Sequence, residues 1–307
     1  MTTTIEWTDV TWNPVRGCSL VSAGCQNCYA MKQAHRFSGP DQPYEGLTEI
    51  GTHGPRWTGK IALDEDALKN PLRWKKPRRI FVNSMSDLFH EDVPDAFIDK
   101  VFAVILCAPR HTFQILTKRP QRMLEYMMAD NGFGRQGHIW HAAYKVSGIH
   151  VPKGKMPPPF PYPHVWLGVS VEDQATADAR IPILLQTPGA VRWVSAEPLL
   201  GPVAIHGWDG SVQRNYLTDS TGPGIDWVVV GGESGPGARP CDIAWIRSIR
   251  EQCQGAGVPV FVKQLGARPY QSPERDGGTG FFLPIKHRKG GAMAEWPADL
   301  RVREWPR

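Results

Sequence analysis

The segment H-V-W-L-G-V-S-V-E-D at residues 164–173 contains the pattern from which the fold can be predicted. Its first six residues form a nearly continuous apolar run, without the polar and apolar alternation of a half-exposed strand. Polar residues then follow, and residues 174–185 have helical periodicity. A strand that is covered on both faces has this composition because neither face meets water. The segment therefore predicts one β/α unit of a parallel sheet.

The same unit recurs along most of the chain. With a first strand inside residues 5–16, about seven parallel strands are expected, which favours an α/β fold with a full or partial (β/α) barrel. A doubly wound open parallel sheet is the alternative fold. The other apolar runs lie at residues 79–82, 112–116, 191–194, 225–230 and 259–262, and helices are expected at 29–37, 64–74, 95–108, 121–129 and 242–254.

The domain organisation is predicted to be simple, with one domain over residues 1–307. Residues 130–163 contain Gly- and Pro-rich segments between two expected strands, and we interpret them as an insertion. Residues 38–60 are rich in Gly, Pro and Thr and are expected to be irregular. The C-terminal residues 267–307 form a basic tail with a short strand expected at 281–285.

Composition limits the function classes. The chain has 307 residues and a net charge of +5, a mild excess that permits a polyanionic partner without requiring one. The N-terminus lacks a basic region followed by an apolar run, and no apolar stretch approaches the ~20 residues that span a bilayer. We therefore expect a cytoplasmic protein with reduced thiols and no membrane partner.

Three of the six cysteines lie in one short segment, C-S-L-V-S-A-G-C-Q-N-C-Y. Cys18, Cys25 and Cys28 have the spacing C-x6-C-x2-C, and no fourth cysteine follows nearby. Thiolates are soft ligands, and three of them predict a [4Fe–4S] cluster with one open coordination position. Two alternatives remain. His35 would complete a structural Cys3His zinc site, and a disulfide would form in an oxidising compartment.

Charged residues follow the predicted strands. Carboxyl ends of parallel strands meet at one edge of a sheet or barrel, where functional groups gather. We therefore expect these residues to converge near the cysteine segment, although a single charge after a strand is often only a solvated turn. The set is Asp87, Lys118, Glu172, Glu197, Glu233 and Lys263.

Two other motifs do not carry a function. Residues 231–237, G-G-E-S-G-P-G, lack the Gly-Lys-Ser/Thr ending of a phosphate loop and the spacing of a dinucleotide-binding motif. Ser170, Ser195 and Ser234 have no histidine in a triad context, so a serine hydrolase is not expected.

The cysteine segment after the first strand resembles that of the radical S-adenosylmethionine (SAM) superfamily. The usual spacing there is C-x3-C-x2-C, so the longer first gap of this chain is a departure. The step from Cys28 to Tyr29 is similar to that of spore photoproduct lyase. Over residues 5–266 the chain resembles a phage and prophage three-cysteine-motif family. The motifs are W-N-P-V-R-G-C, N-S-M-S-D-L-F, L-T-K-R-P, G-V-S-V-E-D, S-A-E-P-L and V-V-V-G-G-E-S-G.

This resemblance implies a cofactor and its ligands. Cys18, Cys25 and Cys28 would each bind one iron of the cluster, and SAM would chelate the fourth. Reduction, by an electron donor such as a flavodoxin or ferredoxin, would cleave SAM to a 5′-deoxyadenosyl radical. The Gly-Gly-Glu that commonly holds the SAM amino group is replaced here by N-S-M-S-D. The residues expected to bind SAM are Ser84, Ser86 and Asp87 of this segment, together with Ser170, Glu172 and Glu197.

The substrate implied is a nucleic acid or nucleotide, in DNA modification or repair. Lys118, Glu233 and Cys241 are the candidate catalytic residues. Cys241 precedes a helix that Asp242 is expected to cap, which predicts a lowered thiol pKa. The similarity to spore photoproduct lyase implies that Cys241 is a hydrogen donor that quenches the product radical. An incidental loop cysteine is the alternative for Cys241. The alternative for the whole chain is a non-catalytic zinc or iron–sulfur module that binds nucleic acid or a partner protein.

Overall fold

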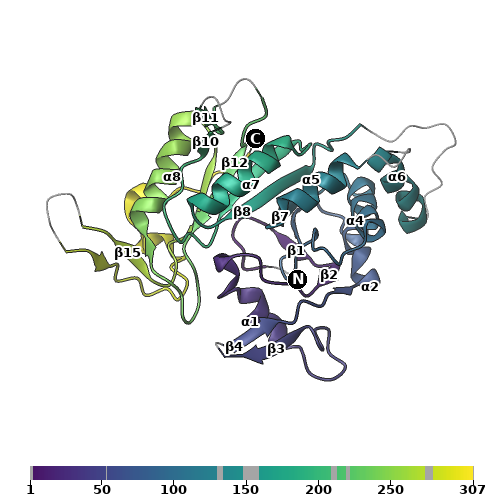
Figure 1. Ribbon diagram of the computed structural model, residues 1–307, viewed down its shortest axis with the longest axis horizontal. Coiled ribbons are helices and arrows are strands. Elements are labelled where there is room, and N and C mark those ends of the chain that lie inside the picture. The colour runs from purple at the N-terminus through teal and green to yellow at the C-terminus, as the bar shows by residue number, and fades with distance from the viewer. Residues whose placement is uncertain are drawn as a thin grey trace. The chain divides into compact units, whose positions relative to one another are not determined.

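The structure is a computed structural model that describes residues 3–52, 54–129, 134–147, 159–208, 213–218, 222–273 and 279–306. The chain divides into two compact units (Figure 1). Unit 1 comprises residues 1–20, 30–168 and 186–191, and unit 2 comprises residues 21–29, 169–185 and 192–307.

A seven-stranded parallel sheet confirms the predicted α/β fold. Its strands follow one another in the order of the chain, without the reversal that defines a doubly wound sheet. The outer edge of the last strand bonds to the C-terminal segment, from Val262 N to Val302 O at 2.9 Å and from Glu304 N to Val260 O at 3.0 Å. Within the residues described, the last strand does not pair with the first, so the sheet is a partial barrel. The strands are β1 (Val10–Trp12), β6 (Arg79–Val82), β7 (Thr112–Thr117), β8 (Val165–Val171), β9 (Val191–Ala196), β12 (Trp227–Gly231) and β14 (Val260–Gln264).

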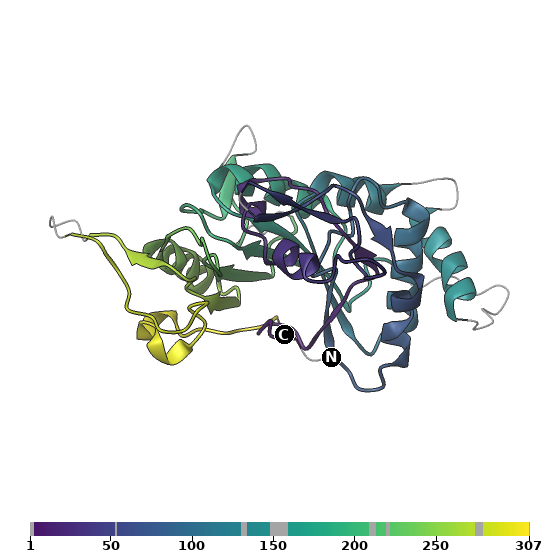
Figure 2. The same cartoon turned by 90° about the horizontal axis from the view of Figure 1, so that it is seen from below.

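Unit 1 contains most of the helices. The helix expected at 64–74 is two helices, because the backbone leaves the helical conformation around Lys69 and Pro71 begins the second one. α4 packs along α6 (Figure 2). The helices are α1 (Tyr29–His35), α2 (Glu65–Leu68), α3 (Asn70–Arg73), α4 (Asp95–Cys107), α5 (Pro120–Met128) and α6 (Gly134–Ser147).

We had expected residues 38–60 to be irregular, and this prediction is wrong for part of the segment. They contain an antiparallel hairpin of β3 (Thr48–Gly51) and β4 (Gly54–Trp57), next to α1 (Figure 1). A second pair joins β2 (Val15–Arg16) to β5 (Ala62–Leu63). These strands are short and largely exposed, so they lack the apolar runs that identify the central sheet.

The expected insertion at 130–163 contains α6. Arg135 anchors this helix through ion pairs to Asp95 at 2.9 Å and Asp99 at 3.1 Å, and its guanidinium stacks over the Tyr126 ring. Residues 130–133 and 148–158 of the expected insertion lie outside the described residues.

Unit 2 is built on an aromatic core across three neighbouring strands. Trp193 and Trp227 lie with their ring centroids 5.2 Å apart, and Trp227 contacts Phe261 at 6.3 Å. The basic tail folds back over this core, with Arg303 over the Phe261 ring. Residues 274–278 and 307 of the tail lie outside the described residues. The other elements are α7 (Gln174–Gln186), β10 (His206–Trp208), β11 (Gln213–Asn215), β13 (Cys241–Asp242), α8 (Ile243–Ala256), β15 (Pro269–Gln271), β16 (Phe281–Phe282) and two short 3-10 helices, η2 (Met293–Glu295) and η3 (Ala298–Leu300).

Among the residues described, no helix has the length and apolar character needed to cross a membrane.

Candidate functional site

The cysteine loop, residues 18–28, carries the chain from unit 1 into unit 2. Cys18 belongs to unit 1, whereas Cys25 and Cys28 belong to unit 2. The loop contains the short 3-10 helix η1 (Ala23–Cys25), and Val21 N donates to Cys25 Sγ at 3.5 Å. None of these three cysteines is in a disulfide, and each residue is partly exposed. Their sulfur atoms could therefore serve as metal ligands.

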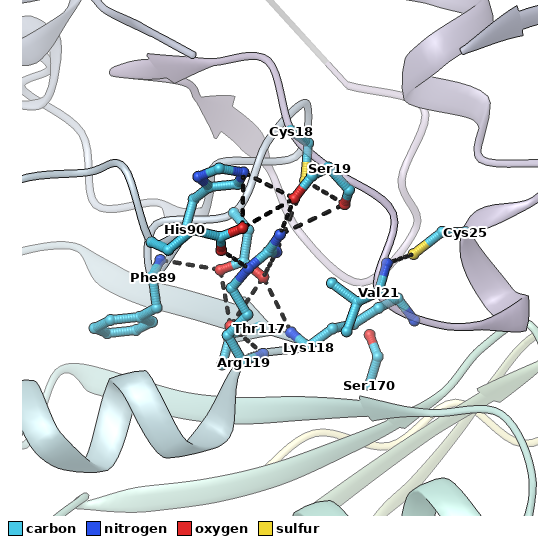
Figure 3. Close-up of polar contacts among 12 residues, drawn as sticks. Cys18, Ser19, Val21, Cys25, Phe89, His90, Thr117, Lys118, Arg119 and Ser170 are labelled. Carbon is cyan, nitrogen blue, oxygen red and sulfur yellow. Dashed lines mark hydrogen bonds and ion pairs between the residues drawn. The ribbon is translucent and has the colours of Figure 1, made fainter. Parts of the chain in front are cut away.

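In unit 1 the start of the loop is held by Arg119 (Figure 3). Its guanidinium donates to Ser19 Oγ at 2.6 Å and to Cys18 Sγ at 3.9 Å. The same Nη1 that donates to Cys18 also donates to Asp87 Oδ2 at 3.2 Å, and Nε donates to Glu91 Oε2 at 2.8 Å. We call Cys18, Ser19, Asp87, His90, Glu91, Thr117 and Arg119 the Cys18 network.

Asp87 organises this network from the loop after β6. Its carboxylate accepts hydrogen bonds from Thr117 Oγ1 at 2.8 and 2.9 Å and from the Lys118 backbone N at 3.1 Å. Thr117 is the last residue of β7, so the carboxylate joins the carboxyl ends of two neighbouring strands. The structure thus brings together two of the predicted site residues, Asp87 and Lys118.

The charge state of the network follows from its contacts. Burial would lower the pKa of Arg119, but Asp87, Cys18 and Glu91 hold it above its ordinary value. Burial and the nearby Arg119 lower the pKa of His90, so its ring is neutral at pH 7. His90 Nδ1 accepts from Asp92 N at 3.2 Å, so the proton lies on Nε2, which is 2.9 Å from Ser19 Oγ.

In unit 2 the loop is held by carboxylates. Glu172 follows β8 and is fully buried, and it accepts from Ser22 Oγ at 2.9 Å. Its charge is balanced by Arg180 of α7 at 3.2 Å. Gly24 packs so closely on this carboxylate that a Cβ there would lie 2.5 Å from Glu172 Oε1. Position 24 therefore requires glycine, because a side chain there would collide with the Glu172 carboxylate.

Glu233, which follows β12, makes the second such contact. Asn27 Nδ2 donates to its Oε2 at 2.9 Å, and Arg239 pairs with both carboxylate oxygens. Burial would raise the pKa of Glu233, but the hydrogen bonds from Arg239 and Asn27 hold it below its ordinary value. Arg239 also donates to the loop carbonyl of Ala23 at 3.0 Å.

Glu197 and Lys263 form a further charged pair at the carboxyl ends of β9 and β14. Lys263 Nζ lies 3.1 Å from Glu197 Oε1, and Ser195 donates to the same carboxylate at 3.4 Å. Gly231 leaves room for it, because a Cβ there would lie 2.7 Å from Glu197 Oε1.

The serines expected to bind SAM have structural partners. Ser84 Oγ donates to Asn13 Oδ1 at 3.2 Å, and Ser86 Oγ donates to Val15 O at 2.7 Å. Ser170 is buried at the end of β8, where its carbonyl accepts from Arg180 at 2.7 Å. The SAM-binding roles of these serines stay predictions.

The expected low pKa of Cys241 is wrong. Asp242 does cap α8, accepting from Ala244 N at 2.9 Å, but the Cys241 thiol is buried with no exposed surface. Burial, reinforced by Asp242, raises the pKa of this thiol to about 12. The effect of burial on the Cys241 thiol pKa thus outweighs the opposite effect expected from the helix N-terminus. The protonated thiol keeps its hydrogen, but contact with a substrate would require Cys241 to become exposed.

A protein-family model of an uncharacterised family, described as a protein of unknown function (DUF5131), matches residues 2–293. The chain belongs to the DUF5131 family. No curated protein and no solved structure matches the chain. Membership in DUF5131 thus leaves the activity to be inferred from the chain itself.

The donor chemistry of this DUF5131 chain fits a thiolate-bound metal centre. Three cysteines that are not in disulfides lie within eleven consecutive residues, and thiolates select zinc or iron–sulfur clusters. Within the described part of the chain, no three His, Cys, Asp or Glu side chains are already arranged to hold a metal ion. The chain thus supplies the donors, and metal binding would have to draw them together.

Sequence reasoning missed the cationic partners in the DUF5131 chain. Arg119 was noted only as part of the basic pair Lys118-Arg119, in support of a nucleic acid substrate, and not as a partner of the cysteine loop. Arg239 stands before proline in A-R-P, which draws attention to the turn and not to the charge. Arg180 lies inside an expected helix. Ser22 and Asn27 lie within the cysteine loop itself, and the polar composition of that loop was the available sign that side chains hold it.

Proposed function

We propose that this protein is a radical SAM enzyme that binds a [4Fe–4S] cluster through Cys18, Cys25 and Cys28. One observation carries the proposal. Three partly exposed cysteines, none of them in a disulfide, share a loop that buried charged residues hold from the carboxyl ends of parallel strands. In parallel α/β folds this end of the sheet carries the functional groups. The resemblance to the radical SAM and phage three-cysteine-motif families supports the same assignment.

The chemistry required of the protein is binding and positioning. When bound, the cluster and SAM supply one-electron cleavage of the sulfonium to give a 5′-deoxyadenosyl radical. The three cysteines supply the thiolates. Asp87, Glu172 and Glu233 act indirectly, because each is bound to an arginine and orients the cysteine loop or its neighbours.

The residues that contact SAM can be narrowed on this basis. Asp87 and Glu172 accept hydrogen bonds from internal partners, so an exchange of those partners would be needed before they bound SAM. Ser84, Ser86 and Ser170 carry hydroxyl groups, which can both donate and accept hydrogen bonds. The Glu197 side chain is 12% exposed and has a lysine partner that a ligand could share. We assign these four residues to the SAM site.

The proposed substrate is a nucleic acid or nucleotide, modified or repaired in the cytoplasm with electrons from a flavodoxin or ferredoxin. Support comes from the net charge of +5 and from Lys118 beside Asp87 at the strand ends. Lys75 and Lys76 are exposed but precede β6, so they lie at the other end of that strand from Asp87. They would contact a phosphate backbone away from the reacting group.

The direct test is product formation. Protein purified without oxygen, reduced with dithionite and mixed with SAM should release 5′-deoxyadenosine and methionine. The Cys28→Ala variant should release neither, while Cys107→Ala should match the unchanged protein. A protein that carries one zinc ion per chain and leaves SAM intact would instead support a non-catalytic module.

A further inference from the structure

Arg119 is a cation that donates a hydrogen bond to Cys18, the first cysteine of the loop. It precedes α5, directly after β7, and its side chain is only 10% exposed. Neither the cysteine spacing nor the family resemblance assigned it a role. Its contacts are shown in Figure 3.

The guanidinium contacts both the carboxylates at the strand ends and the cysteine loop, and its Nη1 donates to one of each, Asp87 and Cys18. Toward the strand ends it meets Asp87 at 3.2 Å and Glu91 at 2.8 Å, which fix its plane and balance its charge. Toward the loop it donates to Cys18 Sγ at 3.9 Å and to Ser19 Oγ at 2.6 Å, and Ser19 O lies 3.5 Å away. Because the donors of a guanidinium are rigidly arranged, the two carboxylates determine where the donor to sulfur points.

Arg119 places positive charge beside this sulfur. His90, which also reaches Ser19 Oγ, is neutral at pH 7 because burial and Arg119 lower its pKa. His90 therefore fixes the serine hydroxyl without adding charge. Asp87 is nearly buried, whereas the Glu91 carboxylate is 63% exposed and screened by water.

We propose that Arg119 is a positioning residue that hydrogen-bonds the Cys18 thiolate in the metal-bound protein and raises the reduction potential of the cluster. This inference rests on the proposed function. Reduction adds one electron to the cluster, supplied by dithionite in the test and by a low-potential flavin or iron–sulfur protein in the cell. Hydrogen bonds to cluster sulfurs and nearby positive charge stabilise the more negative, reduced state.

The test is a redox titration of reconstituted protein, followed by the electron paramagnetic resonance of the reduced cluster. Arg119→Gln removes the charge and keeps a hydrogen-bonding side chain, and Arg119→Lys keeps the charge without the planar group. We expect iron content to be retained, and the midpoint potential to become more negative in both variants, with the larger shift for Gln.

Arg122→Gln is the matched control. Arg122 lies in the first turn of α5, shortly after Arg119, and pairs with Asp95, so its loss also removes one positive charge but leaves the Cys18 network untouched. Its midpoint potential should equal that of the unchanged protein. A more negative potential in Arg119→Gln than in Arg122→Gln then isolates the local contact with Cys18.

Three results would overturn the inference, and they differ from failure of the proposed function. An unchanged potential in the iron-loaded Arg119→Gln variant would show that Arg119 does not act on the cluster. Loss of iron from both variants would make Arg119 a structural support only. If the unchanged protein binds no iron, the proposed function and this inference fall together. Full iron loading of the unchanged protein separates the first two results from the third.

Discussion

The two units differ in the charge of the side chain that makes the shortest contact with a side chain of the cysteine loop. In unit 1 this is Arg119, at 2.6 Å from Ser19 Oγ, and carboxylates balance its charge. In unit 2 these are Glu172 and Glu233, each at 2.9 Å from a loop side chain, and Arg180 and Arg239 balance them. The opposite charge makes longer contacts with the loop in each unit, from Glu91 to Ser19 at 3.4 Å and from Arg239 to Ala23 O at 3.0 Å.

The difference separates two tasks. A cation that faces a thiol can act on its electron density, so Cys18 receives an electrostatic influence from a side chain. Cys25 accepts instead from the backbone of Val21, and the unit 2 carboxylates bind Ser22 and Asn27 of the loop. We infer that unit 2 fixes the shape of the loop, whereas unit 1 also influences a ligand.

The largest expected effect comes from Glu172. Glu172→Ala leaves Arg180 buried without its carboxylate, and an unpaired buried charge costs about 3–5 kcal/mol of unfolding free energy. Urea unfolding measures this loss. Glu91→Ala is the matched change in unit 1, where the carboxylate is 63% exposed, and should cost about 0–1 kcal/mol. Equal losses in the two variants would contradict the comparison.

Gly24 tests how closely the loop packs on Glu172. Gly24→Ala would place a Cβ 2.5 Å from the carboxylate, and such overpacking costs about 1–3 kcal/mol. In the Glu172→Ala background the same change should cost much less, because the atoms in its way are gone. A double-mutant cycle by urea unfolding measures the coupling. Additive effects would mean that Gly24 is not held by Glu172.

The smallest effect concerns the acid dependence of the Glu233 pair. The pKa of Glu233 is lowered in the folded protein, so its contribution to stability is present above its unfolded pKa of about 4.3. That contribution is lost as pH falls through the folded value. Arg239→Gln should therefore cost about 1 kcal/mol at pH 7, and its difference from the unchanged protein should shrink as pH falls through the folded pKa of Glu233.

The control for this pH series is Glu233→Gln, which has no charge to lose. Arg239→Gln added to Glu233→Gln should leave the stability curve between pH 3 and pH 7 nearly unchanged in shape. A constant difference between Arg239→Gln and the unchanged protein at every pH would show that the ion pair is not the cause.

The central sheet was predictable from the sequence for a physical reason. All residues of β8 and β12 are buried, so both strands appear as unbroken apolar runs. Charges after these runs, such as Glu172 and Glu233, were found for the same reason. The β3–β4 hairpin escaped prediction because Ile50 is exposed and glycines and a proline interrupt the pattern.

The partners within the site could not be predicted. Arg119 and Asp87 are thirty-two positions apart in the chain, and neither local sequence indicates that their side chains are in contact. The prediction of a lowered thiol pKa for Cys241 was wrong for a related reason. Its position before a helix is visible in the sequence, but its complete burial depends on packing against distant residues such as Gly232.

The measurement that tests the central claim most directly is iron and acid-labile sulfide per chain, after purification and reconstitution without oxygen. We predict about four of each for the unchanged protein and for Cys107→Ala, since Cys107 lies in α4 outside the loop. Cys18→Ala, Cys25→Ala and Cys28→Ala should each lose the cluster. One zinc ion per chain, or iron retained in a loop variant and lost in Cys107→Ala, would contradict the account.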